Sequence, residues 1–83
     1  MAAKTYTVTV NDKTRLRFET NLAQASAPLI IINEDGSREL TPLGTAYGCY
    51  NAYGCAWAIN GYLLVRGGGG AFSDYEKIVV EEE

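Results

Sequence analysis

The feature of this sequence that most restricts its fold is a strict alternation of apolar and polar side chains near the N-terminus. Residues 4–10, KTYTVTV, place a threonine at every second position, with tyrosine or valine between the threonines. After Asn-Asp at 11–12, the alternation resumes in RLRFE at residues 15–19. Period-2 alternation on both sides of a short turn is typical of two half-buried strands. We therefore expect a β-hairpin over residues 4–19.

A second hairpin is indicated by Asp35-Gly36, because both positions of a tight hairpin turn favour residues that tolerate positive φ. The preceding residues 29–32 are apolar at every position, which predicts a strand buried on both faces. A last strand is expected at residues 78–80. The three glutamates that follow, residues 81–83, are expected to form a solvated acidic tail.

The centre of the chain, residues 40–65, contains no charged side chain and permits two interpretations. In the first, Asn60-Gly61 is the turn of a third hairpin. In the second, a helix over residues 42–58 begins at Thr41-Pro42, with Gly61 as its C-terminal glycine. The glycines inside that helix would be Gly44, Gly48 and Gly54. Each would cost about 1 kcal/mol relative to alanine, and the helix would have no charge on its outer face, so the pattern favours strands.

Together these signals predict a mainly β fold, a small antiparallel barrel or sandwich of six to seven short strands built from hairpins. The alternative is an α+β fold in which one helix, at residues 42–58 or 21–27, packs on an antiparallel sheet. Asn21 would cap the shorter helix and Pro28 would end it. The 83 residues are expected to form one domain, residues 1–83.

The distribution of charge excludes several classes of partner. The net charge is −3 and the basic residues do not form a run, so nucleic-acid binding is not expected. The uncharged centre is interrupted by Pro42 and four glycines and does not predict a membrane span. No secretory signal precedes the first strand. We therefore expect a cytoplasmic protein with reduced thiols.

The residue types that common catalytic and metal sites require are missing or badly spaced. The chain has no histidine, which is the commonest general base and metal ligand. Two cysteines are too few for a structural zinc site. We therefore expect no enzymatic activity, metal or cofactor. The candidates for an anion-binding nest of backbone amides are Gly67, Gly68, Gly69 and Gly70, although no P-loop lysine follows them.

Residues 46–55, AYGCYNAYGC, repeat Ala-Tyr-Gly-Cys and concentrate tyrosine beside small residues. Tyrosine offers a large contact area at low entropic cost, and the core of a protein interface is depleted in charge. The candidate partner-binding residues are Tyr47, Tyr50, Asn51, Tyr53 and Tyr62. The same tyrosines are equally compatible with packing in a core.

Two neighbours of these tyrosines have their own interpretations. Trp57 is expected to be buried, because a small core absorbs one large ring more easily than five. Cys49 and Cys55 are interpreted either as buried, reduced thiols or as a disulfide across a tight turn.

These observations predict a non-enzymatic protein-interaction module that occupies a surface on another protein or on a second copy of itself. In size and acidity the chain is similar to small inhibitors encoded by phages and mobile elements, and this resemblance implies an inhibitor. One alternative is a nucleotide or sugar binder in which aromatic rings stack on the ligand. Another is a structural subunit of a homo-oligomer that buries the uncharged stretch.

Overall fold

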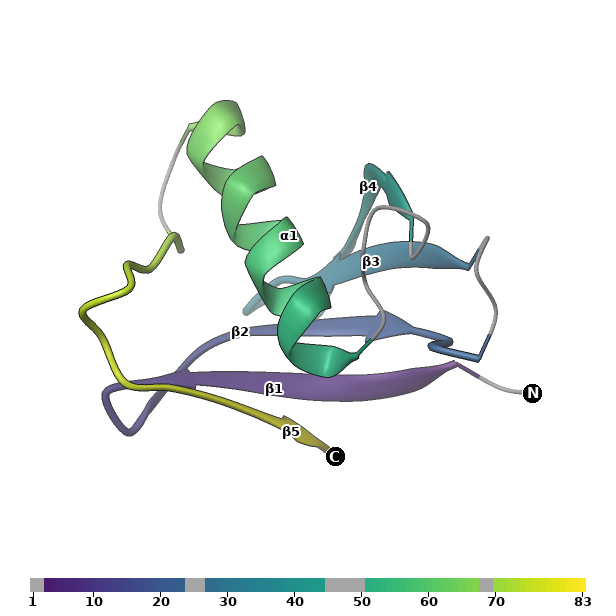
Figure 1. Ribbon diagram of the computed structural model, residues 1–83. Coiled ribbons are helices and arrows are strands. Elements are labelled where there is room, and N and C mark those ends of the chain that lie inside the picture. Colours follow the sequence, from purple (N-terminus) through teal and green to yellow (C-terminus); the bar gives the residue numbers. More distant parts are fainter. Residues whose placement is uncertain (1–2, 24–26, 45–50, 68–69) are drawn as a thin grey trace.

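The computed structural model describes residues 3–23, 27–44, 51–67 and 70–83, which form an antiparallel sheet crossed by one helix (Figure 1). The strands in these residues are β1 (Lys4–Val10), β2 (Lys13–Thr20), β3 (Pro28–Ile32), β4 (Arg38–Gly44) and β5 (Ile78–Glu82). The helix, α1 (Ala52–Arg66), lies between β4 and β5 in the chain. The strand order is β4-β3-β2-β1-β5, so β4 and β5 form the two edges of an open sheet.

The first predicted hairpin is confirmed. β1 and β2 pair with Val10 opposite Lys13, which leaves Asn11 and Asp12 as a two-residue turn. These two residues have positive φ angles of 51° and 68°, as this class of hairpin turn requires.

The second hairpin is also confirmed, but its turn differs from the predicted one. Residues 33–37 join β3 to β4, and in the Asp-Gly pair Gly36 alone has a positive φ, of 88°. Asp35 instead accepts a hydrogen bond from the Ser37 amide at 2.9 Å. The loop is therefore longer than a two-residue turn, and only glycine provides the unusual backbone angle.

β3 is buried on both faces along most of its length, as its apolar run predicts. Leu29 and Ile31 point toward α1 and are buried, and Ile32 is buried on the opposite face. Ile30, which also points away from α1, is half-buried.

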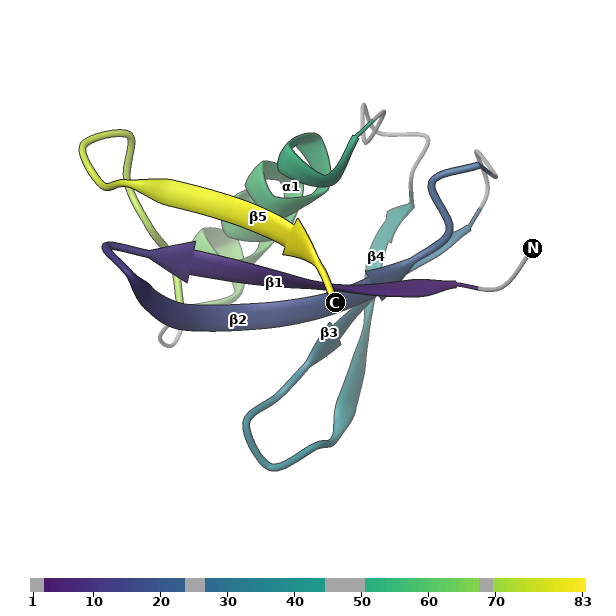
Figure 2. The same ribbon diagram turned by 90° about the horizontal axis from the view of Figure 1, so that it is seen from below.

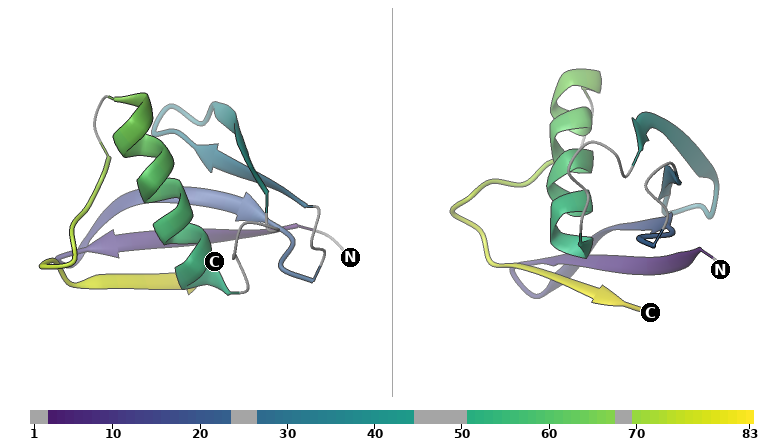
Figure 3. Two further views of the ribbon diagram at one scale, coloured as in Figure 1. Left: turned by 45° about the horizontal axis from the view of Figure 1, so that its top comes forward. Right: turned by 45° about the vertical axis from the view of Figure 1, so that its right-hand side comes forward.

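α1 lies on one face of the sheet, and Figure 3 shows it above the strands in two orientations. The helix begins where the Asn51 side chain accepts a hydrogen bond from the Gly54 amide at 2.8 Å. It ends at Gly67, whose φ of 85° suits glycine. Figure 2, seen from below, shows the sheet in front and α1 behind it. We call the face of the sheet opposite α1 the outer face of the sheet.

The expected mainly β fold with an antiparallel sheet is confirmed. The expected closed barrel or sandwich of six to seven strands is wrong, because the described residues form an open five-stranded sheet. With one helix on this sheet, the fold broadly matches the α+β alternative. Asn60-Gly61 is not a hairpin turn, because both residues lie inside α1. The glycine argument against a helix assumed a start at Thr41-Pro42, but these residues belong to β4. Since α1 begins at Ala52, fewer glycines lie in its interior than the argument counted.

The shorter helix over residues 21–27 is not seen in the described part of that range. Residues 22–23 form a turn in which the Asn21 side chain accepts a hydrogen bond from the Ala23 amide at 3.1 Å. Residues 24–26 lie outside the described residues.

The core lies between α1 and the sheet. Its largest fully buried side chains include Phe18, Leu29 and Ile59, and the rings of Tyr6 and Phe18 stack at 5.2 Å. Cys55 is also fully buried. Cys49 lies outside the described residues, so the choice between thiols and a disulfide is not tested.

A return segment, residues 70–77, leads from the end of α1 back to β5 and is held by the buried side chain of Asn60. The Asn60 amide group donates to the Phe72 carbonyl at 2.9 Å and accepts from the Phe72 amide at 2.7 Å. Arg15 donates to the Ala71 carbonyl, and the Lys77 amide donates to the Asn11 side chain at 2.9 Å. Asn60, which the sequence analysis placed in a hairpin turn, therefore anchors the return segment.

The last strand is confirmed at residues 78–80, and it extends into the terminal glutamates. The Glu83 amide donates to the Thr5 carbonyl at 2.9 Å. The Glu83 carboxylate accepts from Arg17 Nε at 2.7 Å and from Thr7 Oγ1 at 2.7 Å. These exposed glutamates thus help to attach β5 to the sheet. Within the described residues, no helix combines the length and the apolar character needed to cross a membrane.

Candidate interaction surface on the helix

α1 buries Ile59 and Leu63 against the sheet together with smaller residues, and it also presents large apolar residues to solvent. Cys55 and Ala56 are fully buried against the sheet. On the other side, Tyr53 is 45% exposed, Trp57 37%, Leu64 66% and Val65 90%. We define the outer face of α1 as Tyr53, Trp57, Gly61, Leu64 and Val65. In the usual surface helix the side opposite the core is polar, so large apolar residues on this side of α1 are unusual.

Helical spacing brings these residues together. Tyr53, Trp57, Gly61 and Leu64 follow one another at intervals of four, four and three residues, which places them on one side of a helix. Val65 lies four residues after Gly61 and widens the surface. The expected burial of Trp57 is wrong, because over a third of this residue is exposed.

The outer face of α1 carries no charge. Arg66 is the only charged residue of the helix, and its guanidinium pairs with the Glu39 carboxylate of β4. The outer face of the sheet is different, because it carries the ion pairs Arg17–Glu83 and Arg38–Glu19. Only one of these two solvent-facing surfaces has the composition of an interface core.

The Trp57 ring is held in place by the return segment. It contacts Phe72 edge to face, with ring centroids 4.9 Å apart and an interplanar angle of 68°. Phe72 is in turn fixed by its two backbone hydrogen bonds with Asn60. The indole is therefore partly exposed but oriented before any partner arrives, which lowers the entropic cost of binding.

Gly61 adds a second unusual feature to this surface. A Cβ built at Gly61 would meet nothing within 4 Å, and the backbone there does not have the positive φ that requires glycine. Glycine inside an exposed helix costs about 1 kcal/mol relative to alanine. Nothing in the packing of the described residues compensates for this cost. At this position, however, glycine lets another molecule approach the helix backbone closely.

The structure does not bring the predicted partner-binding residues onto one surface. Tyr53 lies on the outer face of α1, and Asn51 serves as the helix N-cap. Tyr62 lies nine residues after Tyr53, which places it about 180° around the helix axis. Tyr47 and Tyr50 lie outside the described residues.

Tyr62 belongs to a polar cluster between α1 and β4. Its hydroxyl donates to Glu39 Oε2 at 2.8 Å, and the Arg66 guanidinium lies 5.8 Å from its ring centroid. The hydrogen bonds from Arg66 and Tyr62 lower the pKa of Glu39. The bond to Glu39 also raises the pKa of Tyr62 and of Arg66. This cluster stabilises the contact of the helix with β4, and it draws the only charge of α1 away from the outer face.

The predicted anion-binding glycines follow the C-terminus of α1. The Gly67 amide donates to the Leu63 carbonyl at 3.0 Å, so it is not available to an anion. The C-terminus of a helix also carries the negative end of the macrodipole, which disfavours an anion there. Gly68 and Gly69 lie outside the described residues, and Gly70 lines a cavity beside Leu63. No group of three or more potential metal ligands occurs within the described parts of the chain.

The residues that the sequence interpretation missed are Leu64 and Val65, together with the exposure of Trp57. The signal was present in the sequence as the lack of charge on the outer face of a helix in this region. It was used as an argument against the helix, because a solvated helix face normally carries charged residues.

Comparison with protein-family models, curated proteins and solved structures yields no match to this chain.

Proposed function

We propose that this protein is a non-enzymatic interaction module that binds a partner protein through the outer face of α1. The observation that carries the proposal is the exposure of Tyr53, Trp57, Leu64 and Val65 on a helix face without charge. Contiguous exposed apolar surface is typical of protein interfaces, and scattered single apolar residues are not. Occupying a partner's surface in this way is also how a small inhibitor acts.

The chemistry of these side chains supports binding rather than solvation. Tyrosine and tryptophan are enriched among the residues that dominate binding energy in interfaces. Full burial of Leu64 or Val65 in a partner would each contribute about 1.5–3 kcal/mol before the costs of association.

The shape of the surface supports a partner with an apolar groove. Tyr53, Trp57 and Leu64 line one side of a helix over about 16 Å, which is the spacing of anchors in helix-in-groove recognition. A groove can surround the side chains that protrude from a convex helix face, whereas a second copy of the same helix would contact them along one line. We therefore favour a different protein over self-association.

Stacking of a nucleotide or sugar on the aromatic rings is less well supported. Tyr53 and Trp57 lie on a convex helix face, and they line neither the cavity beside Leu63 nor the smaller one beside Pro28. Small-molecule sites are normally concave.

The test uses two leucines that differ in location and hardly at all in exposure. Leu64 is 66% exposed on α1, and Leu40 is 67% exposed on β4. Leu40 neighbours Glu39, which points toward α1, so the alternation of a strand directs Leu40 to the outer face of the sheet. We expect Leu64→Glu to weaken partner binding on the order of tenfold or more, and Leu40→Glu to leave it unchanged.

The measurement begins with quantitative capture of proteins from source cells by the native chain and by both variants. A captured protein is then purified, and its dissociation constant is measured for all three. Circular dichroism confirms that the variants fold. Equal binding by all three chains, or equal loss with both variants, would contradict the proposal. Sedimentation velocity across a concentration series identifies self-association through the same face.

A further inference from the structure

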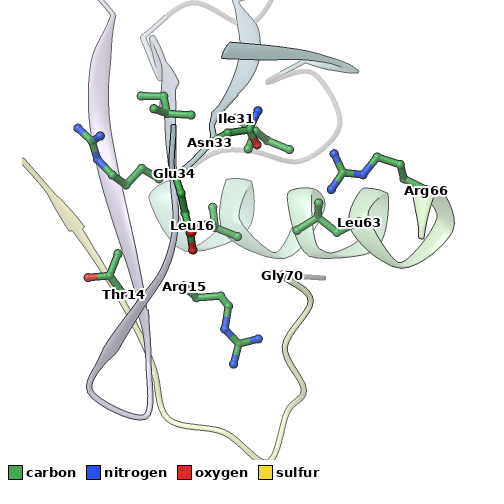
Figure 4. A pocket seen from close by; sticks show the side chains of 11 residues that line it. Thr14, Arg15, Leu16, Ile31, Asn33, Glu34, Leu63, Arg66 and Gly70 are labelled. Carbon is green, nitrogen blue, oxygen red and sulfur yellow. The ribbon is translucent and has the colours of Figure 1, made fainter. Parts of the chain in front are cut away.

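A cavity of about 540 Å³ lies between the C-terminal half of α1 and strands β2 and β3, on a different side of the helix from its outer face (Figure 4). Its volume lies within the range of small-molecule sites in proteins. Residues from β2, the β3–β4 loop, α1 and the return segment line it. The cavity plays no part in the proposed interaction with a partner protein.

The apolar part of the wall is made by core residues. Leu16 of β2, Ile31 of β3 and Leu63 of α1 line the cavity, and each is also part of the hydrophobic core. Figure 4 shows Leu63 reaching from the helix toward Leu16. The site therefore offers an apolar surface to a ligand without exposing a large apolar patch to water.

A β-bulge places an arginine at one end of this wall. In the β1–β2 register, Val8 lies opposite Leu16 and Thr9 lies opposite Thr14, so Arg15 is an extra residue in β2. A bulge of this kind redirects the side chain of the extra residue. The Arg15 side chain lines the cavity, and its guanidinium donates to the Ala71 carbonyl of the return segment.

A second arginine stands across the cavity. Figure 4 shows Arg66, at the end of α1, on the side opposite Arg15. Each of these arginines has one carboxylate partner that does not line the cavity, Glu39 for Arg66 and Glu76 for Arg15. A guanidinium has five N–H donors, so a single carboxylate leaves donors for a ligand.

Glu34, from the β3–β4 loop, is the acidic residue of the lining. Its carboxylate is exposed, and no ion pair involves it among the described residues. An anion in the cavity would be attracted by Arg15 and Arg66 and repelled by Glu34. Arg17 also belongs to the lining, but it pairs with Glu83, which follows β5. The balance of Arg15 and Arg66 against Glu34 favours an anion.

From this arrangement we propose that the cavity binds a small organic anion, a carboxylate attached to a short apolar body. The carboxylate accepts hydrogen bonds from Arg66, whose guanidinium suits this planar group, and Arg15 adds positive charge at the other end of the cavity. The apolar body lies against Leu16, Ile31 and Leu63. The proposal goes beyond the interaction with a partner protein and does not depend on it.

Titration with hexanoate, followed by amide chemical shifts, tests the proposal directly. Hexanol serves as the probe without charge, and inorganic phosphate as the probe without an apolar body. We expect hexanoate at millimolar concentration to shift the amides of residues that line the cavity. Hexanol is expected to bind on the order of tenfold more weakly, which is the loss expected for one charge-assisted hydrogen bond. Phosphate is also expected to bind on the order of tenfold more weakly, because it buries no apolar surface.

Two variants and a matched control test which charged residues of the cavity determine the affinity for hexanoate. Arg66→Gln should weaken hexanoate binding on the order of tenfold, and Glu34→Gln should strengthen it by removing repulsion. Arg38→Gln is the control, because Arg38 also forms one ion pair with a glutamate but does not line the cavity. Its affinity for hexanoate should equal that of the native chain.

Three results would overturn the proposal. The first is the absence of any hexanoate-dependent shift at the cavity while the native chain is folded. The second is equal binding of hexanol, which would show an apolar cavity that does not recognise charge. The third is an equal effect of Arg66→Gln and Arg38→Gln, which would assign the loss to net charge. Loss of partner binding in Leu64→Glu does not bear on these results, so the two proposals fail separately.

Discussion

The side chains on the solvent side of α1 have an apolar character that the stability of the fold does not explain. The side toward the sheet carries Cys55, Ala56, Ile59 and Leu63, which are buried in the core. The solvent side carries Tyr53, Trp57 and Leu64, which are large and apolar and remain exposed. A helix selected only to cover a sheet would carry polar residues on its solvent side, because stability comes from burial of large apolar side chains and not from their exposure. The difference indicates that the inner side supports the fold and the outer side serves another purpose.

The outer face of the sheet provides the reference for an ordinary solvated surface. It carries threonines and the ion pairs Arg17–Glu83 and Arg38–Glu19, while the outer face of α1 carries no charge. The same chain therefore places charged side chains on one solvent-facing surface and none on the other. The following predictions test whether the two sides of the helix are separate in this way.

The largest effect is expected on the inner side. Ile59 is fully buried between α1 and the sheet. Ile59→Ala should lower the free energy of unfolding by about 2–5 kcal/mol, through lost burial and the cavity that it leaves. Urea denaturation measures the change. A loss below about 1 kcal/mol would show that the inner side does not hold the fold.

A smaller loss is expected for Trp57, which belongs to the outer face and also touches Phe72. Trp57→Ala should cost about 1–2 kcal/mol of unfolding free energy, less than the 3–5 kcal/mol typical of a buried tryptophan. The reason is that only part of the indole packs against the protein. If denaturation gives the full loss of a core aromatic, Trp57 belongs to the inner side and the outer face is smaller than defined here.

At Gly61, a substitution is expected to stabilise the protein and not to destabilise it. An added Cβ meets nothing within 4 Å and the backbone is not strained. Gly61→Ala should therefore raise the free energy of unfolding by about 0.5–1 kcal/mol, the difference in helix propensity. Thermal and urea unfolding both report this gain. Destabilisation would reveal a packing role for Gly61 and would remove the reason to connect this glycine with a partner.

The smallest effect is expected on the outer face of the sheet. Hydrogen bonds from Arg17 and Thr7 lower the pKa of Glu83 from 4.5 to about 2. Because the pKa of this acid is lowered by folding, its contribution is complete above about pH 4.5 and is lost as the pH falls toward 2. The melting temperature of the native chain should exceed that of Glu83→Gln at neutral pH, and the two should converge near pH 2. A difference that does not change with pH would contradict the assigned ion pair.

Local signals explain which parts of the fold were predictable. The alternation in β1 and β2 and the turn at Asn11-Asp12 depend on residues close together in the chain, and the hairpin they predict is present. The helix was misjudged because its boundary depends on Asn51 and not on Thr41-Pro42. The helix begins ten residues later than the sequence analysis assumed, so fewer glycines lie in its interior.

The site was less predictable than the fold. The sequence analysis groups the tyrosines as candidate binding residues, but helix geometry separates Tyr53 from Tyr62. The polar residue Asn60 reads as part of a turn in the sequence, while in the structure it binds the backbone of Phe72 inside the core. No local pattern predicts this contact, because the two residues are brought together only when the return segment passes along α1.

By itself, the sequence determined the hairpins, the last strand and the presence of an uncharged central stretch, since each follows from side-chain period or turn chemistry within a few residues. Only the tertiary structure decided which side of that stretch meets water. The helix can lie close to the sheet with Cys55 and Ala56 inward, and Asn60 and Tyr62 then find partners on the return segment and β4. With those contacts formed, Tyr53, Trp57, Leu64 and Val65 face solvent, because they occupy the opposite side of the same helix.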